Sequence, residues 1–306
     1  MTLDELARLG LPQPPPRVPT WTLGFWRRRS ITFANGTTDS ATRVFWLQSG
    51  GLTADLRLPV RRRDVESRAE QARLEGGLAQ TSWDGSKMSW DEWTAFQLHD
   101  KWPEPALLTR IGDCLIEFAP SGIYVEDWRL QSSRPGLLAG LALIEERDCA
   151  SGAVLHRGGG LIVTGEHAAW IKGRPEPLEG ETHLERYLAR HGNDPKAVER
   201  AFAFEASYAR RRGDGEYLVE ASLHPNREGK TLLSLDGFAV DTETGSIRQR
   251  TRDHGRDVER LFTLDTLLAD YSFDLATAAS GDALAWLARE HETLQRDAHP
   301  IDPIAS

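Results

Sequence analysis

The chain has 306 residues, which is enough for one or two domains with a large buried core. Its formal net charge of −9 argues against general binding of nucleic acid or of an anionic membrane surface. The longest apolar run, at 137–144, is too short to span a bilayer, and the acidic, proline-rich N-terminus lacks the apolar segment of a signal peptide. With two cysteines, Cys114 and Cys149, we expect unbonded thiols and a cytoplasmic location.

The first half of the chain predicts antiparallel hairpins. RVFWLQSGGLTADLRL, residues 43–58, contains two runs of aromatic and branched residues joined by a Gly-Gly turn, which is typical of a hairpin. A helix is predicted over 63–77, where acidic residues come early, arginines come late and a glycine pair ends the segment. Strands then recur at even spacing to residue 173. This rhythm predicts an antiparallel sandwich or barrel.

The second half combines helices with further strands. Helical patterns are predicted at 180–200 and at 282–297, and strand patterns lie between residues 203 and 251. The glycine-rich stretch RGGGL at 157–161 lies between two predicted strands. No helix follows it, so it predicts a turn rather than a phosphate-binding loop.

The second strand of the hairpin at 43–58 carries charge on one face. Side chains alternate along a strand, so Asp55 and Arg57 share one face and Leu56 and Leu58 share the other. If the leucines point into a barrel, the charged pair lies in water. If Arg57 points inward, it requires a carboxylate partner, because an isolated buried charge is costly.

The stretch IYVEDWRL supplies that partner. Tyr124, Glu126 and Trp128 share a face, and the two aromatic residues favour a barrel interior. We therefore predict that Arg57 points inward and pairs with Glu126; Glu117 is a further acidic candidate nearby. Such a buried pair has two interpretations: a structural network that fixes strand register, or a polar anchor at the floor of a ligand cavity.

Motifs for metal or nucleophile chemistry are not found in the sequence. No histidine pair has HExxH or HxH spacing, and there is no GxSxG. We therefore predict no metal site and no cofactor. The weak candidates for acid–base catalysis are Glu126 and His99.

Several motifs together resemble a known family. They are WTLGFWRRRSI at 21–31, VFWLQ at 44–48, DLR at 55–57, YVEDW at 124–128 and FEAS at 204–207. This pattern is similar to a bacterial and fungal family of double lipocalin-like proteins and, more distantly, to a yeast protein with two calycin-type barrels. The resemblance implies a mainly β, antiparallel fold of two lipocalin-like β-barrels with added helices. It implies a first barrel at 18–173 and a second barrel-like domain with helices at 174–306.

Three functions follow as alternatives. The first is binding of a small, largely apolar ligand in the first barrel, with no nucleic-acid or membrane partner. The ligand would contact six residues: Trp46, Gln48, Arg57, Tyr124, Glu126 and Trp128. The second is an isomerase, hydratase or decarboxylase on the same scaffold, in which Glu126 or His99 acts as acid–base and Arg57 holds a carboxylate. The third is a non-enzymatic interaction module that uses its helices.

Overall fold

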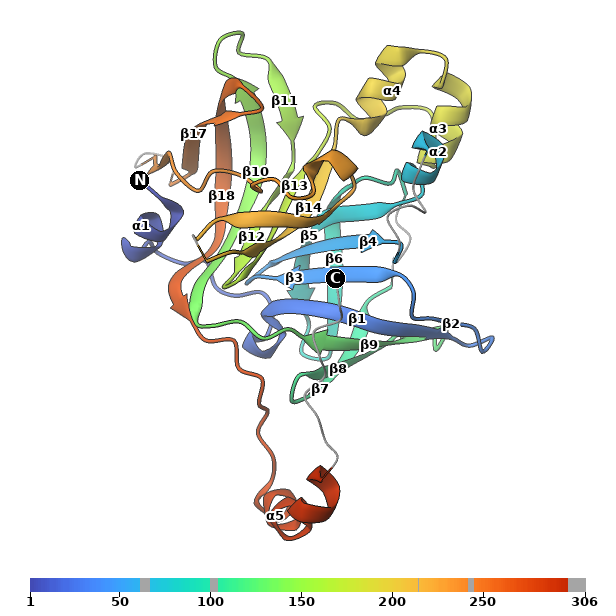
Figure 1. The fold of residues 1–306 in the computed structure, drawn as a ribbon, viewed down its shortest axis with the longest axis vertical. Coiled ribbons are helices and arrows are strands. Elements are labelled where there is room, and N and C mark those ends of the chain that lie inside the picture. Colours follow the sequence, from blue (N-terminus) through green and yellow to red (C-terminus); the bar gives the residue numbers. More distant parts are fainter. Residues whose placement is uncertain (61–66, 100–103, 214, 242–244, 297–306) are drawn as a thin grey trace.

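The protein is mainly β, as predicted. The computed structural model describes residues 1–60, 67–99, 104–213, 215–241 and 245–296 (Figure 1). Strand accounts for 46% of the chain and helix for 16%, and the strand pairings among the described residues are antiparallel. The strands form two sheets, of which one closes into a barrel.

The first sheet is an eight-stranded barrel. Its strands are β1 (Gly24–Phe33), β3 (Arg43–Gln48), β4 (Leu52–Leu58), β5 (Glu75–Trp83), β6 (Lys87–Ala95), β7 (Ala106–Ile111), β8 (Cys114–Phe118) and β9 (Tyr124–Leu130). Each strand pairs with the next one listed, and β9 returns to pair with β1, which closes the barrel. The short β2 (Thr38–Asp39) extends from β1. A closed antiparallel barrel is therefore present in the first half of the chain.

The barrel wall has few backbone pairs between β6 and β7 among the described residues. The described pairing of β6 with β7 covers Lys87 with Leu107 and Met88 with Ala106. Beyond Met88, β6 continues to Ala95 beside β5. This part of β6 has a free edge along the described chain, and it borders the cavity described below.

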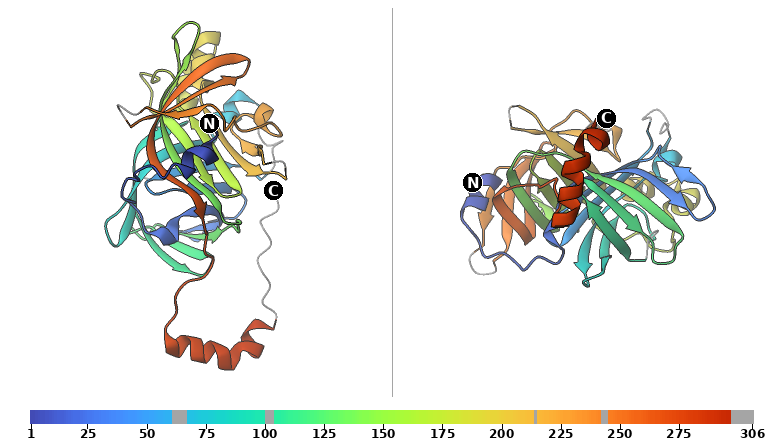
Figure 2. Two further views of the ribbon diagram at one scale, coloured as in Figure 1. Left: turned by 90° about the vertical axis from the view of Figure 1, so that its left-hand side faces the viewer. Right: turned by 90° about the horizontal axis from the view of Figure 1, so that it is seen from below.

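The second sheet is an open, strongly curved layer (Figures 1 and 2). Its strands are β10 (Gly136–Asp148), β11 (Val154–Arg157), β12 (Gly159–Thr164), β13 (His167–Lys172), β14 (Glu205–Arg211), β15 (Tyr217–Ser222), β16 (Phe238–Val240), β17 (Ile247–Asp253) and β18 (Arg256–Tyr271). The order runs from β15 to β16, and no pairing of described residues joins these two ends. The expected second barrel is thus an open sheet in the described chain.

The sheets divide the chain earlier than the expected boundary at 173. The first sheet ends with β9 at Leu130, and β10 begins the second sheet at Gly136. The strands at 136–172 pair with β14 and with β18, far along the chain. Even strand spacing does not reveal which sheet a strand joins, because the pairing is set by distant partners.

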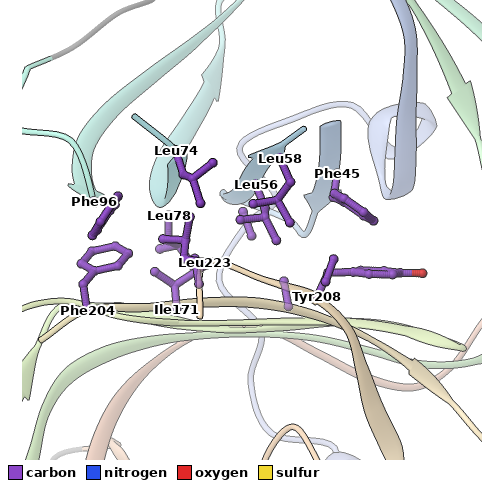
Figure 3. Packing of buried hydrophobic residues seen from close by; sticks show 14 of the residues in the cluster. Phe45, Leu56, Leu58, Leu74, Leu78, Phe96, Ile171, Phe204, Tyr208 and Leu223 are labelled. Atoms are coloured by element: carbon purple, nitrogen blue, oxygen red, sulfur yellow. The ribbon is translucent and has the colours of Figure 1, made fainter. Parts of the chain in front are cut away.

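The two sheets pack face to face. Leucine and phenylalanine side chains from β3, β4 and β5 point out of the barrel onto β13 and β14 of the second sheet and the segments beside them (Figure 3). Leu56 and Leu58 belong to this layer, where they are 3% and 0% exposed, and they meet residues such as Ile171 and Leu223 across it. The face of β4 that carries Leu56 and Leu58 therefore packs on the second sheet. Because side chains alternate along a strand, the opposite face of β4 lies toward the barrel interior.

Helices cover the ends and the outer face. They are α1 (Leu3–Arg8), α2 (Arg68–Gln71), α3 (Leu184–His191), α4 (Pro195–Phe202) and α5 (Gly281–Gln295). Leu3 and Leu6 of α1 are buried against the face of the second sheet that points away from the barrel, in a cluster with Trp170 and Phe262. No helix of the described residues has the length and apolarity needed to cross a membrane.

One helix prediction differs from the structure, and another is confirmed. In place of a helix over 63–77, α2 spans one turn, begun by a Ser67–Glu70 capping box; residues 63–66 lie outside the described part. Residues 75–77 of the predicted helix are instead the start of β5, where Glu75 and Gly77 pair with Arg57 and Asp55. The C-terminal helix is confirmed, but it extends away from the body with Leu284, Trp286 and Leu294 about half exposed (Figure 2).

Candidate functional site

A cavity of about 300 Å³ lies inside the barrel. It is bounded by β3, β4, β5, β6, β8 and β9 and by the segment that follows β6. Its lining residues are Trp46, Thr53, Asp55, Arg57, Glu75, Gly76, Gly77, Trp90, Trp93, Ala95, Gln97, Leu98, His99, Glu117, Tyr124, Glu126 and Trp128. This volume is at the lower end of the range for small-molecule sites.

Tryptophans form much of the apolar wall. The rings of Trp90 and Trp128 each meet Trp46 edge to face, with centroids 6.3 and 5.2 Å from its ring. Trp46 donates its indole N–H to Gln48, Trp90 to Thr53 and Trp128 to Glu117. Because protein acceptors hold these three N–H groups, the rings are fixed in orientation and offer a ligand mainly hydrocarbon and π surface.

Trp93, the fourth tryptophan of the lining, differs from these three in its hydrogen bonding. Trp93 lines the same cavity, and its buried indole nitrogen has no hydrogen-bond acceptor among the described residues. A buried donor without an acceptor costs about 1–3 kcal/mol.

Arg57 points into the barrel, as predicted. Its Nε and Nη2 atoms donate to the two carboxylate oxygens of Asp55, at 2.9 and 3.3 Å, and Glu75 lies 4.0 Å away on β5. Burial lowers the pKa of the Arg57 guanidinium, but Asp55, Glu126 and Glu75 outweigh that effect and raise the pKa above its usual value. Arg57 is thus a permanent cation held among carboxylates.

The predicted direct pair of Arg57 with Glu126 is wrong. Glu126 forms its ion pair with Arg28, whose Nη1 lies 2.6 Å from Oε1, and both side chains are 4% exposed. Arg28 also reaches Asp39 at 3.0 Å. A β-bulge between Arg28 and Ser30 shifts the register of β1 against β9. The bulge allows both Arg28 and Ile31 to face inward, although strict alternation would place them on opposite faces.

Glu117 and Glu126 lie directly opposite each other on β8 and β9. Like charges in this position destabilise a sheet. Glu117 is 4% exposed, and it accepts hydrogen bonds from Trp128 Nε1 at 3.0 Å and from the Tyr124 hydroxyl at 3.3 Å. Burial, followed by the nearby Glu126 carboxylate, raises the pKa of Glu117 well above its ordinary value. This carboxyl group therefore faces the cavity with a strong tendency to hold a proton.

Replacing Glu117 with glutamine should alter how stability depends on pH. The neutral carboxyl is favoured in the folded state, so its contribution is complete below the unfolded pKa, near 4, and is lost as the pH rises through the raised folded pKa. The amide does not titrate, so the stability of Glu117→Gln relative to wild type should grow with pH above about 4. The slope can reach about 1.4 kcal/mol per pH unit. Urea unfolding at several pH values measures it, and a difference independent of pH would contradict the assignment.

Of the two remaining predicted residues, Gln48 lies outside the cavity lining and His99 lies within it. Gln48 lies beneath the cavity rather than in its lining: its amide nitrogen donates to the carbonyls of Ser49 and Leu52, and its oxygen accepts from Trp46. It supports the Trp46 ring. His99 does line the cavity, with Nδ1 3.0 Å from the Thr182 carbonyl oxygen and its ring beside His183.

Several residues of the site were not predicted. They are Arg28, Asp55 and Glu75, which form ion pairs, and Trp90, Trp93 and Gln97, which line the cavity. Glu75 lies opposite Arg57 in the pairing of β4 with β5. This pairing is not reached from the sequence, because a helix is predicted over 63–77. Trp90 and Trp93 share a strand that was recognised, but a bulge in the pairing of β5 with β6 places both at the cavity.

The chain matches no protein-family model, no curated protein and no solved structure at a significant level. Function therefore has to be argued from the cavity. Within the described residues, no three His, Cys, Asp or Glu side chains are grouped as a metal ion would require. Both cysteines are free; Cys149 is exposed and Cys114 is half-buried, and burial raises the pKa of the Cys114 thiol.

Proposed function

We propose that the barrel binds a small, largely apolar molecule in the cavity lined by Trp46, Trp90 and Trp128. The observation that carries this proposal is the cavity itself: about 300 Å³ of space with tryptophan walls and a few convergent polar groups. A monomeric domain gains free energy by filling such space with its own side chains, so an apolar cavity with polar groups is the usual form of a ligand site.

The proposal includes the likeness to double lipocalin-like proteins. A closed eight-stranded antiparallel barrel of this size holds one small ligand in its interior, which fits the likeness. The second sheet would then be the counterpart of the second barrel, with α1 and its neighbours covering the face that a closed barrel would enclose. The free thiols fit the proposed cytoplasmic location.

The first test is native mass spectrometry of freshly purified protein, in which a co-purifying small molecule is expected. The second uses the neutral fluorescent probe N-phenyl-1-naphthylamine. Ala95 lines the cavity, so Ala95→Phe should fill part of it and weaken probe binding by about tenfold or more. Ala41→Phe, at an exposed position in the turn before β3, is the matched control and should bind like wild type. Absence of both a co-purifying molecule and probe binding would reject the proposal.

A second candidate function is acid–base catalysis, favoured by one observation. Glu117 faces the cavity with a raised pKa, as a proton donor or acceptor for a bound substrate would. Glu126 suits this role less well because its carboxyl group is already paired with Arg28. The distinguishing result is chemical change: a ligand released unaltered after incubation favours binding, and one consumed by wild type but not by Glu117→Gln favours catalysis.

A further inference from the structure

The cavity is lined by more acidic than basic groups. Four carboxyl groups, those of Asp55, Glu75, Glu117 and Glu126, reach it, against the guanidinium of Arg57. Arg28 supplies a second positive charge to Glu126, but it shares that charge with Asp39. Among the described residues, Glu117 is the carboxyl group of this lining that pairs with no arginine or lysine, so a positive charge on a ligand could be held beside it.

A ligand carboxylate would find its natural partner already occupied. Both donors of Arg57 that face Asp55 are used in a two-point hydrogen bond, and Glu75 lies on the adjacent strand. An anionic ligand would have to displace a carboxylate that is fixed on the same strand as Arg57. It would also approach the carboxyl group of Glu126 in the lining.

The tryptophan walls suit a cation as well as an apolar group. Indole rings attract positive charge at their faces, and this attraction is strongest for Trp and grows when water is excluded. Trp46, Trp90 and Trp128 have their N–H groups engaged within the protein, so their π systems are the part left for a ligand. Trp128 also joins the two features, because it donates to the carboxylate of Glu117.

We propose that the molecule held in the barrel is an organic cation, a protonated or quaternary amine with apolar substituents, whose counter-ion is Glu117 and whose apolar part lies among the tryptophans. This inference rests on the proposed ligand-binding function and specifies its ligand class.

Binding of the cation replaces a proton. Without a ligand, Glu117 is stabilised as the neutral acid by burial and by Glu126. When a cation binds, the Glu117 proton passes to solvent and the carboxylate stays paired with the ligand. The other groups around it are Arg57, Asp55, Glu75 and His99 of the lining, together with its hydrogen-bond donors. Because the proton must leave, affinity for the cation should rise with pH, whereas affinity for a neutral molecule of the same shape should not.

The test compares three molecules of similar size by displacement of N-phenyl-1-naphthylamine. They are benzyltrimethylammonium, its neutral carbon isostere neopentylbenzene, and phenylacetate. The inference predicts that the ammonium compound binds about tenfold or more tightly than the neutral isostere, and that phenylacetate binds weakest. If the neutral compound binds as well as the ammonium compound or better, the charge inference is wrong while ligand binding stands. If neither they nor the probe bind, the proposed function itself fails.

Glu117→Gln then assigns the counter-ion. The variant should lose the preference for ammonium while keeping its affinity for neopentylbenzene. Glu259→Gln removes the same charge from β18 in the second sheet, where Glu259 pairs with Arg250, and it should leave the preference intact. An unchanged preference in a folded Glu117→Gln protein would overturn the assignment. If that variant does not fold, the pH dependence of ammonium affinity in the wild-type chain replaces it, and an affinity constant with pH overturns the assignment.

Discussion

Replacement of Arg57 with alanine is expected to lower the free energy of unfolding by about 3–5 kcal/mol, the scale for removing one partner from a buried ion pair. The Arg57 and Asp55 side chains are 16% and 13% exposed, and Glu75 beside them is 19% exposed. Without the guanidinium, these carboxylates remain inside the barrel with Glu126 nearby. Their repulsion and lost pairing outweigh the entropy that the shorter side chain recovers.

The measurement is chemical denaturation of Arg57→Ala beside Arg250→Ala. Arg250 also forms an ion pair, with Glu259, but its side chain is 77% exposed, so its loss should cost less than about 1 kcal/mol. Adding Asp55→Asn to Arg57→Ala should restore part of the lost stability, because the amide carries no charge. Equal stability of the two single variants would show that Arg57 is solvated. Arg57 and Asp55 would then no longer be counted as part of the proposed site.

The strand pattern around Arg57 shows how much of the site the sequence contained. Alternation correctly placed Asp55 and Arg57 on one face of β4, and it placed Tyr124, Glu126 and Trp128 together at the cavity. It left two orientations of β4 open, because the leucines and Arg57 competed for one interior. The structure resolves this competition by burying both faces: Leu56 and Leu58 pack on the second sheet, and Arg57 faces the cavity. A strand between two layers has no exposed face to choose.

The parts that sequence reasoning missed depend on long-range register. Arg28 meets Glu126 only because a bulge shifts β1 against β9, and no local pattern marks that bulge. The 16-residue strand β18 was not predicted at all, since acidic residues such as Asp257 and Glu259 interrupt its apolar positions. Its alternation places Val258, Arg260 and Phe262 on the buried face, and the buried arginine there is compensated by Glu146 on β10. A buried charged residue can therefore be predicted from the sequence only when the residue that pairs with it can be identified as well.

Arg28 provides a second test of the buried ion pairs around the cavity. Alanine at this position should lower the free energy of unfolding by about 3–5 kcal/mol, because Glu126, 3% exposed, would then lie opposite Glu117 on β9 and β8 without its 2.6 Å partner. The same change at Arg134, which is 89% exposed beside Glu166, should cost less than about 1 kcal/mol.

A double variant separates lost charge pairing from lost packing in that result. If the cost of Arg28→Ala comes from the orphaned carboxylate, adding Glu126→Gln should recover more than half of it, since the neutral amide neither repels Glu117 nor requires a cation. If the cost comes from the missing side-chain volume, the two effects should simply add. Thermal and urea unfolding of the four proteins in this cycle give the coupling energy. A coupling near zero would mean that Arg28 and Glu126 do not stabilise each other as an ion pair, and the pairing of charges around the cavity would have to be reassessed.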